Sequence, residues 1–155
     1  MALSIGQKAP EFKLYNSELK EVALSDYAGK NLVVHFFPLA FIGMCTTQLI
    51  ALRDSFHRED TLTSGVLAIS VDSPFTLARF KEENHFPFQL LSDFNKKVSR
   101  DYGAFYEEFV FGLEGVSKCA VFVINRTQEI IYAEILESAG ELPDYESIVR
   151  AAESF

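Results

Sequence analysis

The stretch of residues 31–49 constrains the fold of this chain more than any other. Residues 32–37 are aliphatic or aromatic apart from one histidine, which is typical of a strand covered on both faces. Pro38 then removes a backbone donor and ends the strand. After a short loop, apolar side chains recur at helical spacing from Cys45 onwards. The pattern predicts a buried strand, a loop and a helix whose first turn carries Cys45 facing inward.

A cysteine at the start of a helix has a chemical meaning. The unpaired amides and the positive end of the helix dipole favour a thiolate over a thiol, and a thiolate is a nucleophile. The alternative is a small buried side chain that only packs. The strand, proline, loop and helix start around Cys45 favour the nucleophile.

Composition and charge exclude several classes of protein. A chain of 155 residues with 48% hydrophobic residues is long enough for one domain over residues 1–155. A net charge of −8 without a Lys/Arg cluster argues against nucleic-acid binding. The longest apolar run, residues 32–45, is interrupted and too short to cross a bilayer. Two widely spaced cysteines form neither a disulfide scaffold nor a metal site, so we expect a soluble, cytoplasmic protein without metal or cofactor.

The rest of the chain predicts an α/β fold. We expect further strands at residues 10–15, 20–24, 66–71, 88–91, 119–124 and 128–134. We expect further helices from Pro74 to before Asn84, with Phe75, Ala78 and Phe80 facing inward, and over residues 92–102 and 141–152. Residues 102–112 are predicted to form an aromatic loop. The order of elements predicts the thioredoxin plan: a mixed central sheet, helices on both faces and an N-terminal β-hairpin.

Residues 36–45, taken with residues 67–71 and 115–124, resemble the peroxiredoxins over nearly the whole chain. The resemblance is closest to the one-cysteine bacterial alkyl hydroperoxide reductase E type. It implies a peroxidase that reduces a peroxide with a peroxidatic cysteine, which becomes a sulfenic acid and is restored by an external thiol. The family motif is proline, three residues, threonine or serine, two residues, cysteine. Pro38 and Cys45 stand at that spacing, so the resemblance assigns Cys45 as the nucleophile and Pro38 as its shield from water.

The sequence departs from the family at three positions. Ile42 stands where the motif has a hydroxyl, and Gln48 stands where the family usually has a glutamate. Cys119 occupies the position of the active-site arginine. Lys118 is not a substitute, because neighbouring strand residues point to opposite faces.

These losses predict a slow enzyme. Removing one donor to the reacting oxygens typically costs about 10² to 10³ in rate, and losing an arginine also removes a cation beside the thiolate. The groups that remain are the helix N-terminus, the backbone amides around Met44 and Cys45, and Pro38.

Two functions from different classes follow from this pattern. The first is a thiol peroxidase for hydrogen peroxide or organic hydroperoxides. The second is a catalytically degenerate peroxiredoxin fold that serves as a redox-responsive or interaction module. A thioredoxin-like disulfide reductase fits less well, because no second cysteine follows Cys45 in the helix. His35 is expected to be a core residue with its hydrogen bonds satisfied rather than a base.

The expected partners are a peroxide and an external thiol of the thioredoxin, glutaredoxin or low-molecular-weight type. A homodimer is expected, with Phe41 and the aromatic loop of residues 102–112 near its interface. A sulfenic acid on Cys45 could also condense with Cys119. We expect an outside thiol instead, because buried strand positions move little and a disulfide needs a Cα separation of roughly 4.4 to 6.8 Å.

Overall fold

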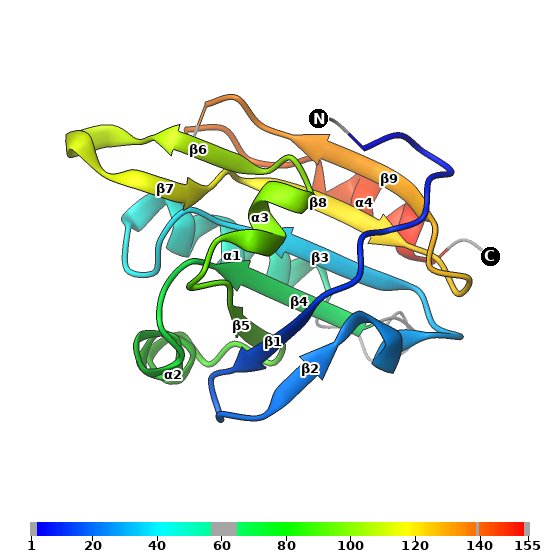
Figure 1. The fold of residues 1–155 in the computed structure, drawn as a ribbon, viewed down its shortest axis with the longest axis horizontal. Helices are drawn as coiled ribbons and strands as arrows, with labels where there is room; N and C mark the ends of the chain where they lie inside the picture. The colour runs from blue at the N-terminus through cyan, green and yellow to red at the C-terminus, as the bar shows by residue number, and fades with distance from the viewer. Residues whose placement is uncertain (1–2, 57–64, 139, 154–155) are drawn as a thin grey trace.

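The computed structural model describes residues 3–56, 65–138 and 140–153 (Figure 1). Seven strands form one sheet in the order β2-β1-β5-β4-β3-β8-β9, and β6 and β7 form a second, two-stranded sheet. The strands are β1 (Lys13–Asn16), β2 (Glu21–Ala23), β3 (Leu32–Phe36), β4 (Gly65–Ser70), β5 (Gln89–Ser92), β6 (Phe105–Glu108), β7 (Glu114–Ser117), β8 (Ala120–Ile124) and β9 (Ile130–Ile135). The helices are α1 (Gly43–Ser55), α2 (Pro74–Asn84), α3 (Lys97–Asp101) and α4 (Tyr145–Ala152), with short 3-10 helices η1 (Leu24–Tyr27) and η3 (Val110–Gly112).

β3 lies inside the seven-stranded sheet, and all of its residues are buried. It runs parallel to β4, with Val34 opposite Leu67, and antiparallel to β8, with Val34 opposite Phe122. Because a parallel neighbour can be reached only by a crossover, the chain between β3 and β4 passes through α1. The βαβ unit and the hairpins β1–β2 and β8–β9 confirm the predicted thioredoxin-like plan.

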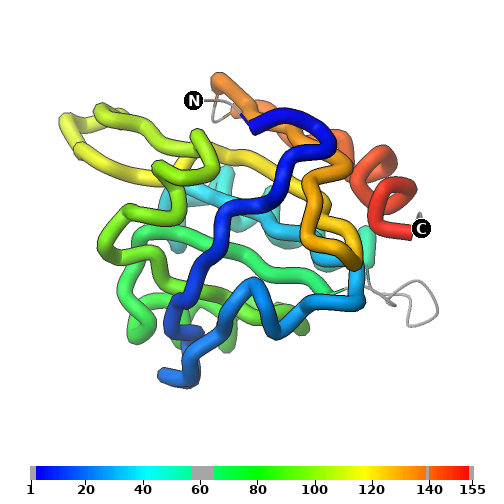
Figure 2. Tube along the Cα trace, turned by 45° about the vertical axis from the view of Figure 1, so that its right-hand side comes forward, coloured from blue at the N-terminus to red at the C-terminus, as the bar shows by residue number. Residues whose placement is uncertain are grey.

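Helices cover both faces of the sheet. α1, α2 and α4 share one hydrophobic core with Val33 and Val121, while α3 lies on the opposite face beside a core that contains Phe36 and Phe122 (Figure 1). These two pairs face opposite ways because successive side chains of a strand alternate between faces. The segment before β1 is tied by backbone hydrogen bonds to the chain between β8 and β9, and Figure 2 shows it running alongside.

α2 begins where the sequence predicts. Ser73 is its N-cap, and the Ser73 Oγ accepts a hydrogen bond of 3.2 Å from the backbone amide of Thr76. The predicted inward face of α2 is wrong in part. Leu77 and Phe80 are its buried residues, whereas Phe75 is 71% exposed. Phe75 precedes Leu77 by two positions, which places it on the other side of the helix.

Residues 102–112 do not form the loop that the sequence predicts. They contain β6, which pairs antiparallel with β7, and Figure 1 shows this hairpin projecting beyond the central sheet. Tyr102 is fully buried, and its hydroxyl donates to the carbonyl oxygen of Pro10 at 2.7 Å. Phe111, in η3 between the two strands, is 95% exposed. The aromatic residues of this segment therefore divide between core and surface.

Three other boundaries differ from the predicted ones. β8 begins at Ala120, so Cys119 lies in a bend just outside the strand. α3 is shorter than predicted, and the Asp93 carboxylate accepts hydrogen bonds from two backbone amides of its first turns. α4 begins only at Tyr145, where the side chain of Asp144 caps it. No helix in the described ranges is long and apolar enough to pass through a membrane.

Candidate active site

The connection from β3 to α1 places Cys45 in the first helical turn, as predicted. Pro38 follows β3 and is buried. Cys45 is the third residue of α1 and is 2% exposed, and Leu49 and Leu52 continue the buried face of the helix. All three side chains belong to the core that α1, α2 and α4 form on one face of the sheet.

The loop that precedes Cys45 is held by two contacts. One comes from Asp72, which lies just before α2, and the other comes from Phe80 in α2. The backbone amide of Ala40 donates to the Asp72 carboxylate at 2.7 Å, and the rings of Phe41 and Phe80 pack with centroids 5.1 Å apart. Phe41 has a left-handed backbone, with a φ of 72°, which is uncommon for a bulky residue. Gly43 needs no such conformation, and a Cβ there would meet no described atom within 4 Å.

The Cys45 thiol does not have the lowered pKa that its place at a helix start predicts. Burial raises the pKa of Cys45 to about 11, a hydrogen bond with the Leu39 backbone opposes this rise, and the negative charge of Asp72 adds to it. Burial and the charge of Asp72 therefore oppose the thiolate that the start of α1 is expected to favour. The sequence resemblance assigns Cys119 to the family's arginine position, and a cysteine there supplies no guanidinium to offset the cost of burying a negative sulfur.

Cys119 lies on the same side of the sheet as Cys45. It is fully buried, and both thiols are free. Val121 and Val123 share the face of Cys119 by strand alternation, and both belong to the core that contains Cys45. Burial raises the pKa of Cys119 to about 12, and the negative charge of Cys45 contributes to the rise. The Cys45 and Cys119 side chains are thus close enough to interact electrostatically.

Lys118 points away from this site, as alternation predicts. Its Nζ lies 3.4 Å from the Glu137 carboxylate and 5.5 Å from the centre of the Tyr106 ring. Gln48, which the sequence resemblance assigns to the family's glutamate position, is 1% exposed, and its Nε2 donates to the carbonyl oxygen of Glu141 at 3.1 Å. Its Oε1 is buried without a hydrogen-bond partner in the described part of the chain. Gln48 therefore contributes a neutral amide, of which only the nitrogen is hydrogen-bonded, rather than a charged carboxylate.

Sequence reasoning missed a hydrogen-bonded chain that anchors the second turn of α1. The Tyr145 hydroxyl, at the start of α4, donates to the backbone carbonyl oxygen of Gln48 at 2.8 Å and lies 2.9 Å from Nε2 of His35. Nδ1 of His35 lies 3.0 Å from the carbonyl oxygen of Phe36. Burial lowers the pKa of His35 to about 4, so the ring is neutral near pH 7. This confirms His35 as a core residue with satisfied hydrogen bonds.

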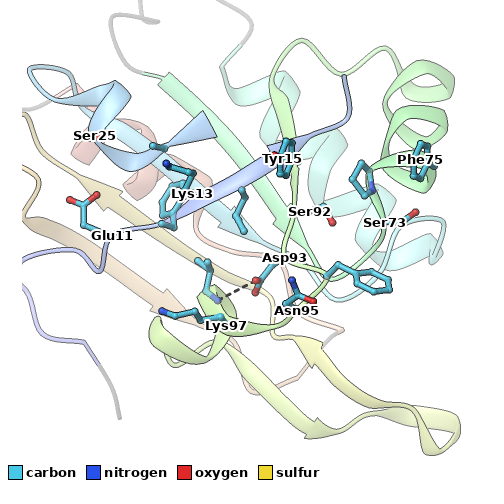
Figure 3. A pocket seen from close by; sticks show the side chains of 16 residues that line it. Glu11, Lys13, Tyr15, Ser25, Ser73, Phe75, Ser92, Asp93, Asn95 and Lys97 are labelled. Atoms are coloured by element: carbon cyan, nitrogen blue, oxygen red, sulfur yellow. Dashed lines mark hydrogen bonds between the residues drawn. The ribbon is translucent and has the colours of Figure 1, made fainter. Parts of the chain in front are cut away.

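A hollow of about 860 Å³ lies elsewhere, between β1, the start of α2 and the chain leading into α3. Figure 3 shows Lys13, Tyr15, Phe75 and Lys97 among its lining residues, and neither cysteine lines it. Its size is therefore no argument about the chemistry of Cys45. Among the described residues, no group of three or more His, Cys, Asp or Glu side chains is arranged to hold a metal ion.

Comparison with known proteins supports the resemblance seen in the sequence. The model of the AhpC/TSA family matches residues 5–133. The putative peroxiredoxin bcp of Haemophilus influenzae is 40% identical over 131 residues, which cover 83% of this chain and 84% of that protein. Alkyl hydroperoxide reductase E of Mycobacterium tuberculosis is 38% identical over 145 residues, which cover 92% of this chain and 91% of the relative.

Solved structures agree on the fold. A peroxiredoxin-like protein from Aquifex aeolicus superposes with a TM-score of 0.88 at 23% identity, covering 99% of this chain and 88% of the other. The family model, the two relatives and this shared fold span the strand, loop and helix that hold Pro38 and Cys45. The chain therefore belongs to the AhpC/TSA family, the peroxiredoxins.

Proposed function

We propose that this protein is a thiol peroxidase that reduces hydrogen peroxide or organic hydroperoxides with Cys45. The observation that carries the proposal is the place of Cys45 in the first turn of α1, at the family's spacing from Pro38. The thiolate attacks one peroxide oxygen, the O–O bond breaks, and the leaving oxygen takes up a proton to become water or an alcohol. The sulfur is left as a sulfenic acid, and an external thiol supplies the electrons that restore it.

The same site argues for a slow reaction. Ile42 offers no hydroxyl, Cys119 offers no guanidinium, and Gln48 replaces the usual glutamate. Each lost donor to the transition state costs about 10² to 10³ in rate. A pKa of about 11 also leaves little thiolate at neutral pH. What supports catalysis is the N-terminus of α1 with the backbone amide of Met44, and Pro38 as a shield against water.

The raised pKa favours a second candidate, a degenerate peroxiredoxin fold that acts as a redox-responsive or interaction module. In that case the buried thiol would pack without reacting with peroxide. Steady-state consumption of peroxide in the presence of a thioredoxin, a glutaredoxin or a low-molecular-weight thiol separates the two candidates. Turnover with any of these reductants supports the enzyme.

We also propose the cytoplasm as the location, one domain over residues 1–155, and a homodimer. The two free cysteines suit a reducing compartment. Phe41 is 49% exposed, and Val110, Phe111 and Leu113 around η3 are exposed as well. Clustered exposed apolar side chains suit an interface core. Sedimentation of the protein at micromolar concentration should show a dimer, and a monomer alone would contradict this part of the proposal.

The peroxidase proposal is tested by a peroxide pulse followed by a reagent specific for sulfenic acid. We expect label on Cys45 in the wild-type protein and none at this position in Cys45→Ser, whose hydroxyl is not oxidised. Cys45→Ser should also lose all thiol-dependent peroxide consumption. Wild-type protein whose Cys45 carries neither the label nor a disulfide bond, or equal consumption by wild type and Cys45→Ser, refutes the proposal.

A further inference from the structure

The two cysteines lie at the same end of the sheet. β3 and β8 are antiparallel neighbours, and Phe36, the last residue of β3, is opposite Ala120, the first residue of β8. The chain leaves β3 through a short loop to Cys45, and Cys119 directly precedes Ala120. Both sulfurs therefore belong to segments that meet at one edge of the β3–β8 pair.

The two side chains also lie close enough to interact, because the negative charge of Cys45 contributes to the raised pKa of Cys119. Alternation along β8 turns Cys119 to the face that α1 covers, where Val121 and Cys45 are members of one buried cluster. Cys119 is fully buried and Cys45 is 2% exposed, so each thiol is closed off from outside reductants in the resting protein. A sulfenic acid formed on Cys45 would accordingly meet the Cys119 thiol more readily than a bulky thiol from solution.

Neither cysteine is fixed in the interior of an element. Cys119 lies in a bend rather than in the strand that the sequence predicts, and its carbonyl oxygen accepts a hydrogen bond of 2.9 Å from the Leu136 amide. The movement that a disulfide needs must therefore come from the first turn of α1. At the start of α1, Ile42 is the N-cap and makes no side-chain cap hydrogen bond in the described structure. Gly43 follows it, and Phe41 before it has a left-handed backbone. A helix start with these features unwinds more easily than a capped one.

We propose that Cys119 is the resolving cysteine of this protein and forms a disulfide with Cys45 after the first turn of α1 unwinds. The step rests on the proposed peroxidase function, because it needs the Cys45 sulfenic acid. The Cys119 sulfur attacks the Cys45 sulfur, an S–S bond forms and the S–O bond breaks. The hydroxide leaves and combines with the Cys119 thiol proton as water. An external thiol then reduces the disulfide by exchange, which returns both cysteines to thiols.

The test treats reduced wild-type protein at low micromolar concentration with one equivalent of hydrogen peroxide. Remaining thiols are alkylated, and peptides of the monomer band are mapped by mass spectrometry without reduction. We expect a peptide pair linked through Cys45 and Cys119. The matched variant Cys119→Ala has no second sulfur, so its Cys45 sulfenic acid should survive at least tenfold longer and give more label with the sulfenic-acid reagent. Hydrogen exchange should show loss of protection at the Thr46 amide, which donates to the Ile42 carbonyl oxygen, in the oxidised wild type alone.

The outcomes separate this inference from the function on which it rests. Persistent sulfenic acid on Cys45 beside a free Cys119 in the wild type overturns the inference and leaves the peroxidase intact. If neither protein forms a sulfenic acid, the peroxidase proposal fails, and a diazene oxidant that joins neighbouring thiols directly decides the pairing. A Cys45–Cys119 link with that oxidant supports the pairing, and its absence overturns it.

Discussion

The N-termini of α1 and α2 lie close together and are built differently. α2 starts with a proline after Ser73, whose hydroxyl accepts a hydrogen bond from a first-turn amide. α1 starts with a glycine after Ile42, which cannot cap. Residues in and just before α2 also hold the start of α1, because Asp72 and Phe80 contact the loop that leads into α1. The loop is thus held by contacts from outside it, while the first turn that carries Cys45 begins without a side-chain cap.

The comparison teaches that a helix N-terminus does not by itself make a cysteine reactive. Cys45 has the dipole of α1 behind it, yet burial and the nearby charge of Asp72 keep the proton on its sulfur. A cation or a hydroxyl donor beside the sulfur would favour the thiolate, and the sequence resemblance assigns Cys119 and Ile42 to the positions where the family has these groups.

The largest expected effect comes from restoring both missing donors. Ile42→Thr with Cys119→Arg should raise the rate of peroxide reduction by about 10² or more and lower the pKa of Cys45. Because the two groups address one small site, their effects should not add simply. Stopped-flow kinetics and pH-dependent alkylation of the two single variants and the double variant measure this.

A control on folding accompanies this experiment, because Cys119 is fully buried and a guanidinium there needs a partner. Circular dichroism and thermal unfolding identify a folded double variant. Such a variant with an unchanged rate and an unchanged Cys45 pKa would show that these positions do not face the thiol.

A smaller effect is expected from Asp72→Asn. The same carboxylate oxygen of Asp72 accepts hydrogen bonds from the Ala40 amide and the Ser70 hydroxyl, and an asparagine oxygen can accept both. The variant therefore removes the charge and keeps the brace. We expect the pKa of Cys45 to fall below that of the wild type, with faster alkylation at neutral pH. A pKa that rises in a protein of unchanged melting temperature would contradict the electrostatic role of Asp72.

The smallest effects are expected from weakening the N-terminus of α2 and stabilising the N-terminus of α1. Ser73→Ala removes the cap of α2 and should lower the free energy of unfolding by about 1 kcal/mol. Gly43→Ala should raise it by about 0.4 to 1 kcal/mol, because a methyl group there meets no described atom within 4 Å. Urea denaturation measures both. Gly43→Ala should also slow the formation of the Cys45–Cys119 disulfide, because it stabilises the first turn of α1 that must unwind. If Cys45 already lay within bonding distance of Cys119, the substitution would leave the rate of disulfide formation unchanged.

The fold and the place of Cys45 could be predicted because their signals are local. A continuous apolar strand, a proline and a change to helical spacing lie within residues 31–49. The start of α2 could likewise be predicted from Ser73 and Pro74. Hairpin ends and inward faces were harder, because the burial of Phe75 or Tyr102 depends on which distant elements cover them.

The parts of the site that escaped prediction depend on contacts between distant segments. Asp72 reaches the loop before Cys45 only once β3 and β4 are parallel neighbours. Tyr145 meets His35 and Gln48 only when α4 packs against α1 and β3. The raised pKa of Cys45 follows from the same packing, whereas the helix-start rule considers the helix alone.

The pKa of the Cys45 thiol tests the account most directly. It is measured by the rate of Cys45 alkylation against pH, with Cys119→Ala used so that one thiol reacts. A group with a raised pKa near 11 is almost entirely protonated at pH 7, so the rate should climb about tenfold per pH unit through pH 8 and level off only near pH 11. A rate that is already level below pH 7 would show a stabilised thiolate and would contradict the account.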